Sequence, residues 1–144
     1  MSSPAEELAQ RIRDGFAESL GAGIAAPGAF VADLVEVRHE PPNPNDGVKP
    51  GAEAAAGWAM TGPSVARVMA DAAFGDVRVT VLGDHEVFVE AFLRGTGPDG
   101  VVLDHPLSLR YTLRDGKVVH VLEVSDPAPL AALGAARRAQ APAD

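Results

Sequence analysis

Cysteine is absent from this 144-residue chain, which excludes a disulfide framework, a thiolate metal site and a cysteine nucleophile. Lysine is scarce, with two residues against ten arginines, and the formal net charge is −8. Because nucleic-acid binding needs clustered cationic side chains, this charge argues against a nucleic-acid partner. No apolar run approaches the about 20 residues of a membrane-spanning helix. With a polar, acidic start unlike a signal peptide, these absences predict a cytoplasmic protein without membrane contact.

Several motifs of known chemistry are also missing. The four histidines lie apart, without i,i+4 pairing, an HExxH motif or a carboxylate at ligand spacing, so no metal site is predicted. The glycine-rich segment 95–100 is not followed by a helix, which argues against a phosphate-binding loop. No serine has a nucleophile-elbow context. The sequence therefore implies neither metal nor cofactor, and its richness in Ala, Gly, Pro and Arg is typical of a GC-rich bacterial genome.

What is present is the balance of a globular protein, with 47% hydrophobic and 22% charged residues. Leu8, Ile12 and Phe16 recur every four residues and predict an amphipathic helix that starts near Ser3 or Pro4. The elements expected next are a short helix over 27–34, a strand over 35–40, a proline-rich loop over 41–47 and a helical region over 52–73, kinked near 61–63.

Beyond Gly75 the hydrophobic period changes from helical to the two-residue period of strands. The sequence predicts strands over 77–81, 86–94, 101–114 and 117–126, with a tight hairpin at Asp115-Gly116. A short helix over 130–138 and a frayed tail over 139–144 complete the chain. Helices followed by an antiparallel meander indicate an α+β fold, in one domain over 1–144 with its core at about 6–130.

Two segments carry a family resemblance. One is Val37-Arg38-His39-Glu40-Pro41, followed by a loop and Gly51-Ala52-Glu53; the other is LRDGKVVHVLEV over 113–124. In this order they resemble the SnoaL-like polyketide cyclase and ketosteroid-isomerase-like branch of the NTF2-like superfamily, over about residues 6–130. The resemblance implies a cone-shaped, cystatin-like fold. In it, N-terminal helices pack on a curved, mainly antiparallel sheet around a small apolar pocket.

The resemblance also implies two catalytic residues. In SnoaL-like cyclases, an acidic residue after the tryptophan of the last strand is the general acid/base, and here that position is Glu123, preceded by Leu122. The family histidine falls on His39, with Glu40 in place of the usual Asn. Rival sites transfer less well. An epoxide-hydrolase-like site needs an Arg-x-Asp pair where this chain has Ala91 and Leu93, and a ketosteroid-isomerase-like site needs a first-helix tyrosine that is absent.

Alternation along the last strand gives Glu123 a second, independent argument. It places Val119, Val121 and Glu123 on one face, and Val118, His120, Leu122 and Val124 on the other. A carboxylate among valines loses hydration, which favours its protonated form and suits a proton donor or shuttle near neutral pH. The alternative is a surface glutamate, or one paired with an arginine such as Arg110.

The other candidate residues each have two interpretations. His39 can contact a ligand oxygen at the mouth of the cone, or can anchor the proline loop through backbone carbonyls. His105 and Tyr111 share the apolar face of their strand, so each is either a hydrogen-bonded core residue or a ligand contact. Trp58, among alanines, is either a pocket wall or core packing. Ala91 is a further candidate for substrate binding.

Two classes of function remain open. The first is a cofactor-independent cyclase or isomerase that acts on an apolar, oxygenated small molecule such as a polyketide or terpenoid. The second is a non-catalytic binding or accessory protein with the same cone; an epoxide hydrolase is disfavoured by the missing charged pair. Apolar side chains on the outer face of the sheet, including Phe88, Phe92, Leu122 and Val124, predict a homodimer through that face, with His120 at the interface.

Overall fold

The computed structural model describes residues 2–140, and its first element is helix α1 (Pro4–Glu18). Ser3 caps it: its hydroxyl accepts from the Glu6 amide, and the Glu6 carboxylate accepts from the Ser3 amide, both at 3.2 Å. This reciprocal pair satisfies two amides that lack helical partners. Leu8 and Ile12 are fully buried, so the predicted amphipathic face is confirmed and covers the sheet.

The segment after α1 contains less helix than predicted. Helix α2 (Ala22–Ala25) and a single 3-10 turn, η1 (Ala26–Phe30), lead directly into strand β1 (Val31–Glu40). The predicted helix over 27–34 is therefore wrong beyond Phe30. Val31 pairs with Val118 in the sheet, and a β-branched residue fits a paired strand better than a helix.

Three further elements surround the loop and the kink. Strand β2 (Gly47–Pro50), which the sequence did not predict, pairs antiparallel with β1 at the edge of the sheet. Helices α3 (Gly51–Ala59) and α4 (Thr61–Val68) confirm the expected break. Helical structure ends at Val68 rather than near 73, because Ala73 already pairs with Arg94 in the sheet.

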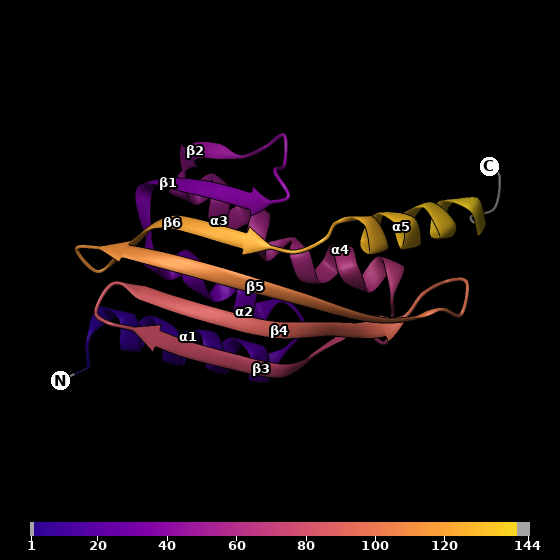
Figure 1. Ribbon diagram of the computed structural model, residues 1–144, viewed down its shortest axis with the longest axis horizontal. Helices are drawn as coiled ribbons and strands as arrows, with labels where there is room; N and C mark the ends of the chain where they lie inside the picture. Colours follow the sequence, from indigo (N-terminus) through magenta and orange to yellow (C-terminus); the bar gives the residue numbers. More distant parts are fainter. Residues whose placement is uncertain (1, 141–144) are drawn as a thin grey trace.

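The meander consists of β3 (Ala73–Leu82), β4 (Glu86–Thr96), β5 (Val102–Arg114) and β6 (Lys117–Val124). The sheet order is β2-β1-β6-β5-β4-β3, and β1 and β6 pair in parallel while the other neighbours are antiparallel. Helices α1 to α4 lie on one face of this sheet (Figure 1). The α+β class and the Asp115-Gly116 turn, with φ of 52° and 75°, are confirmed.

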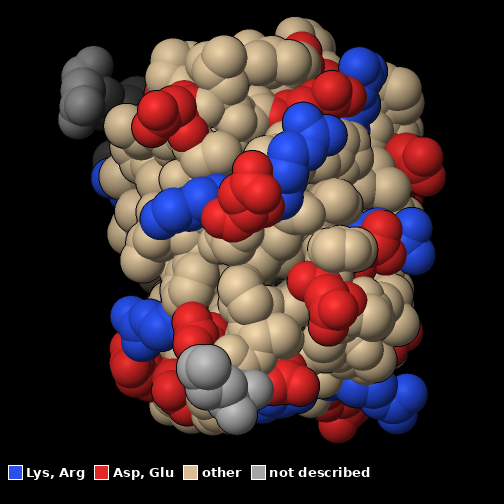
Figure 2. All heavy atoms as spheres, turned by 90° about the vertical axis from the view of Figure 1, so that its left-hand side faces the viewer, with Lys and Arg blue, Asp and Glu red and all other residues tan. Residues whose placement is uncertain are grey.

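The final helix, α5 (Ala128–Gln140), extends past one end of the sheet (Figure 1). It includes residues 139 and 140, which were expected to fray; residues 141–144 lie outside the described part of the chain. None of the helices within residues 2–140 has the length and apolar character that crossing a bilayer demands. At the end of the molecule drawn in Figure 2, acidic and basic side chains are interspersed, so this face offers no continuous cationic surface.

The alternation expected for β6 breaks at a bulge. Thr112 lies opposite His120, but the next residue of β5, Leu113, lies opposite Val118, so β6 has one extra residue there. Val118 is consequently fully buried on the helix-covered face, and its predicted outward position is wrong. Beyond the bulge, Val121 lies opposite Tyr111 and Glu123 opposite Leu109, both of which are buried, so the inward position of Glu123 is confirmed.

The start of α3 is held against β1 by close backbone contact at a glycine. A Cβ atom on Gly51 would overlap the carbonyl oxygen of Ala32, whereas a Cβ on Gly57, in the same helix, meets no atom within 4 Å. We therefore expect Gly51→Ala to lower the free energy of unfolding by about 2 kcal/mol through overpacking. Gly57→Ala should raise it by about 0.5–1 kcal/mol through helix propensity. Urea denaturation measures the free energy of unfolding of both variants. Equal changes in the two variants would contradict the close contact between Gly51 and Ala32.

Candidate functional site

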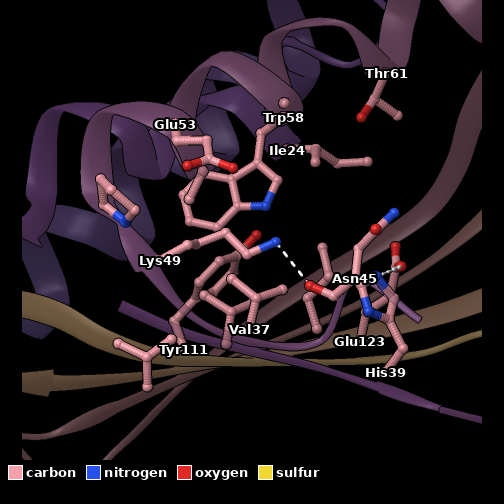
Figure 3. Close-up of a pocket in the computed structure, with 16 residues that line it drawn as sticks. Ile24, Val37, His39, Asn45, Lys49, Glu53, Trp58, Thr61, Tyr111 and Glu123 are labelled. Carbon is pink, nitrogen blue, oxygen red and sulfur yellow. Dashed lines mark hydrogen bonds and ion pairs between the residues drawn. The ribbon is translucent and has the colours of Figure 1, made fainter. Parts of the chain in front are cut away.

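A cavity of about 770 Å³ lies between helix α3 and the inner face of the sheet, and is called the first cavity here. Figure 3 shows α3 above it, with Glu53 and Trp58 pointing down, and Val37 and Tyr111 on the sheet below. The lining residues are Ile24, Val37, His39, Asn45, Val48, Lys49, Pro50, Glu53, Ala54, Gly57, Trp58, Thr61, Leu109, Tyr111, Val121 and Glu123. Both predicted catalytic residues, and two of the predicted binding residues, therefore share one cavity.

His39 lies between two carboxylates at the wall of the first cavity. Its Nε2 is 3.1 Å from Oε2 of Glu123, and its Nδ1 is 2.6 Å from Oδ1 of Asp46. The first contact follows from the parallel pairing of β1 and β6, in which His39 and Glu123 occupy directly opposite positions. Neither carboxylate is fully exposed, with 31% of the Glu123 side chain and 12% of the Asp46 side chain accessible.

Asp46 also closes the proline-rich loop. Its Oδ2 accepts hydrogen bonds from the backbone amides of His39 and Asn43, at 3.0 and 3.2 Å. His39 therefore anchors the loop, as one of its two interpretations predicted; it also lines the cavity, and its contact with a ligand oxygen stays a prediction. The anchor is the Asp46 carboxylate, however, and not backbone carbonyls as the sequence suggested.

The two carboxylates change the protonation of the imidazole. The contact with Glu123, followed by that with Asp46, outweighs partial burial and raises the pKa of His39 to about 9. The His39 contact, in turn, lowers the pKa of Asp46 to about 2. At neutral pH the cluster therefore contains an imidazolium.

These pKa shifts also make the stability of the fold depend on pH. Because the folded pKa of His39 exceeds the ordinary 6.5, its contribution to stability is complete below pH 6.5 and is lost as pH rises through about 9. The Asp46 contribution is present above pH 3.8 and is lost as pH falls through about 2.

Glu123 does not lie among valines alone, as the sequence suggested. Its partner is His39, and Arg110, the alternative partner, lies 3.8 Å from Glu86 instead. An ion pair supplies the compensation that a partly buried carboxylate needs. The prediction that the Glu123 carboxylate lies among apolar side chains alone is therefore wrong, whereas Glu123 does line the cavity as expected.

Tyr111 presents a protonated hydroxyl to the same cavity. Its side chain is 1% exposed, and burial, assisted by the negative charge of Glu123, raises its pKa. The hydroxyl makes no hydrogen bond among the described residues. Because no fully buried side-chain polar atom of these residues lacks a partner, the hydroxyl must be open to the cavity. Tyr111 lies opposite Val121, two positions from Glu123 along β6, so a ligand can reach both groups.

A second cavity of about 410 Å³ adjoins the first. His105, which is 3% exposed, contributes to its wall, and its Nε2 is 2.8 Å from Oγ of Ser125. His105 is thus a hydrogen-bonded core residue, and its role as a ligand contact stays a prediction. Ala91 is buried in β4 and lines neither this cavity nor the first; it contributes to a separate cavity of about 500 Å³, together with Phe92 and Val124, and its role in substrate binding stays a prediction.

Sequence reasoning missed three polar residues of the site: Asp46, which contacts His39, and Lys49 and Glu53, which line the first cavity. Asp46 follows three prolines at the end of a loop, where nothing local indicates a partner. Lys49 belongs to the unpredicted strand β2, whose pairing with β1 turns its side chain towards the cavity (Figure 3). Glu53 was noted within the Gly51-Ala52-Glu53 segment, and only the placement of α3 makes it a lining residue.

No protein-family model and no curated protein matches this chain in sequence. Its structure nevertheless resembles many solved proteins. A protein of Jannaschia sp. CCS1, provisionally named a SnoaL-like polyketide cyclase, is 19% identical with a TM-score of 0.62, over 90% of both chains. An NTF2-like protein of unknown function from Burkholderia pseudomallei K96243 is 16% identical with a TM-score of 0.62, over 92% of this chain and 98% of that one. TerC, co-crystallized with polyporic acid, is 21% identical with a TM-score of 0.59, over 91% and 98%.

These likenesses confirm the cone-shaped NTF2-like fold that the sequence resemblance predicted. They extend over nearly the whole chain, so the helices and the sheet both take part in the match. At such low identities the shared property is the fold, and the chemistry of the cavity has to be argued from its own residues.

The protonation of His39 is directly measurable by NMR. We expect its imidazole resonances to titrate near pH 9 in the wild type. Glu123→Gln should lower this pKa more than Asp46→Asn, because Glu123 makes the larger contribution. The resonances of His85, in the turn between β3 and β4, should be unchanged by either substitution and serve as the internal control. A wild-type His39 that titrates near pH 6.5 would rule out the charged cluster.

Proposed function

We propose that this protein is a cofactor-independent acid/base enzyme, a cyclase or isomerase, for an apolar oxygenated small molecule such as a polyketide or terpenoid. The observation that carries the proposal is a carboxylate, Glu123, held by an imidazolium at the wall of a cavity that apolar and polar side chains line together. A positioned carboxylate near a substrate is one of the side chains that enzymes use as a general base. The co-crystallization of TerC with polyporic acid supports small-molecule binding by this fold.

The proposed reaction begins with proton transfer to Glu123 from a carbon next to a carbonyl group. The electron pair of the broken C–H bond moves into an enolate, and the Tyr111 hydroxyl donates a hydrogen bond to its oxygen. In an isomerization, Glu123 returns the proton to a different carbon. In a cyclization, the enolate carbon bonds to a second carbonyl carbon, and the resulting alkoxide takes the proton.

His39 is a positioning residue in this scheme. Both of its ring nitrogens contact carboxylates, so it orients Glu123 and balances its charge rather than touching the substrate. Trp58, on α3, forms the wall opposite the sheet and would pack against the substrate (Figure 3). Deprotonation of His39 above about pH 9 would remove the charge that holds Glu123, so activity should fall there.

A non-catalytic binding protein is the second candidate function. The observation that favours it is that the His39–Asp46 contact also closes the loop over residues 41–46, a structural task that needs no chemistry. In that case the cavity would bind its ligand unchanged, and loss of the Glu123 carboxylate would alter affinity without altering any reaction.

Exchange of carbon-bound hydrogen distinguishes the two functions without a known substrate. Cyclic ketones and β-ketoesters are incubated with the protein in heavy water, and loss of their α-proton signals is followed by NMR. The wild type should accelerate exchange, and Glu123→Gln should reduce that acceleration at least a hundredfold, since general-base catalysis contributes about 10²–10⁴. Glu90→Gln, on the exposed face of β4, is the matched control and should exchange like the wild type. Exchange by Glu123→Gln within a few-fold of the wild type would exclude Glu123 as the base.

We also propose that two copies associate through the outer face of the sheet. Val124 is 42% exposed there, beside half-buried Leu122, Phe88 and Phe92. A self-complementary contact across a two-fold axis would cover this face in both copies. His120, which lies 3.8 Å from Glu36 on the same face, would then be near the interface.

Light scattering tests this association. The wild type at micromolar concentration should have twice the 14.8 kDa mass of one chain. Val124→Glu should shift the population to the single chain, whereas Val101→Glu, the same substitution at an exposed position just before β5, should not. A wild type of single-chain mass would overturn the prediction.

A further inference from the structure

The two cavities meet at the His39–Glu123 pair. Their linings share His39, Glu123, Ile24 and Thr61, so the proposed base lies at the junction of two compartments and not at the bottom of one. Volumes of about 770 and 410 Å³ each fall in the range of small-molecule sites. A substrate that places its reacting carbon beside Glu123 can therefore extend in two directions.

The first cavity contains a cation without an anionic partner. Lys49 is half-buried, and its Nζ donates to the backbone carbonyl oxygen of Asn45 at 2.9 Å. No carboxylate within the described residues forms an ion pair with it, and an ammonium group has three donors. Figure 3 shows this amine near the middle of the cavity, between Trp58 and Asn45.

The carboxylates in and beside the first cavity do not supply that partner. Glu123 and Asp46 both contact His39. Glu53, on α3, lines the cavity and is exposed, and it forms no ion pair with Lys49 among the described residues. Lys49 is thus the cavity cation with donors available to a ligand, which indicates an anionic group at this end.

The second cavity has the opposite character. Its apolar lining comes from the sheet, with Phe74, Leu93 and Leu107, and from the helices α4 and α5, with Val65 and Leu130; prolines of the loop and Pro127 add to it. Its polar side chains His105 and Ser125 bind each other and so have less need of a ligand. Such a surface is suited to hydrocarbon, which gains free energy from burial and needs no hydrogen bonds.

We infer that the substrate is an amphipathic carboxylate, with its carboxylate at Lys49 in the first cavity, its apolar tail in the second, and its reacting carbon beside Glu123. Only the placement of the reacting carbon rests on the proposed function. The binding of the carboxylate at Lys49 and of the apolar tail in the second cavity does not depend on catalysis. It narrows the substrate class from oxygenated apolar molecules to acids with a hydrocarbon extension.

Trp58, the one tryptophan of the chain, lies in the wall of the first cavity and reports binding by its fluorescence. The probes are hexanoate, octanoate and decanoate, each compared with its methyl ester at equal chain length. Carboxylates should bind about tenfold more tightly than esters, as expected for a charge-assisted hydrogen bond. Affinity should rise roughly fourfold per methylene while the tail fills the second cavity. Esters that bind as well as acids, or affinity independent of chain length, would refute the inference.

Paired variants separate the two ends of the ligand. Lys49→Met should reduce carboxylate affinity to that of the ester and leave ester affinity unchanged, whereas Lys117→Met, the other lysine, at the exposed start of β6, should have no effect. Val65→Phe, in the second cavity, should weaken decanoate more than hexanoate; Ala66→Phe, on the exposed side of α4, should not. Unchanged carboxylate affinity in a folded Lys49→Met protein would also overturn the assignment.

These results are distinguishable from a failure of the proposed function. Selective binding of carboxylates by a protein that exchanges no α-protons would support the inference and favour a binding protein. Exchange that depends on Glu123, with no preference for carboxylates, would support the enzyme and overturn the amphipathic substrate.

Discussion

Parallel pairing between β1 and β6 is the contact on which the site depends. The two strands come from opposite ends of the chain, and their register places His39 directly opposite Glu123. Every other pair of neighbouring strands is antiparallel, and in most of these pairs the two strands are consecutive in the chain and connected by a short turn. The functional contact therefore requires the whole meander to fold back on β1, and this couples the formation of the site to the completion of the sheet.

The charged cluster has a cost that the fold offsets in several ways. Placing an imidazolium and two carboxylates at a cavity wall removes part of their hydration, and mutual contact compensates for it. Backbone amides of His39 and Asn43 supply further hydrogen bonds to Asp46. The same bonds hold the proline-rich loop, so the electrostatics of the site and the shape of its entrance depend on the same atoms.

The fold alone does not determine the function, because the chemistry of a cavity depends on the side chains that line it. Similar proteins include an NTF2-like protein of unknown function as well as one provisionally named a polyketide cyclase. The chemistry available to this chain comes from its side chains: an imidazolium between carboxylates, a buried tyrosine hydroxyl and a half-buried lysine at the first cavity. His39 and Glu123 meet at the junction of the cavities, whereas Tyr111 and Lys49 line the first cavity and not the second.

Local patterns in the sequence determined the elements whose causes are local. The spacing of Leu8, Ile12 and Phe16 determined α1, Asp115-Gly116 determined the last hairpin, and alternation placed Glu123 inward with Val121. Tertiary structure decided which strand lies beside which. It thereby paired His39 with Glu123, brought Asp46 to His39 and Lys49 to the first cavity, and turned Val118 inward at a bulge. The reason is physical: side-chain periodicity is a property of a few consecutive residues, whereas strand order and register depend on the free energy of packing segments that are distant in the chain.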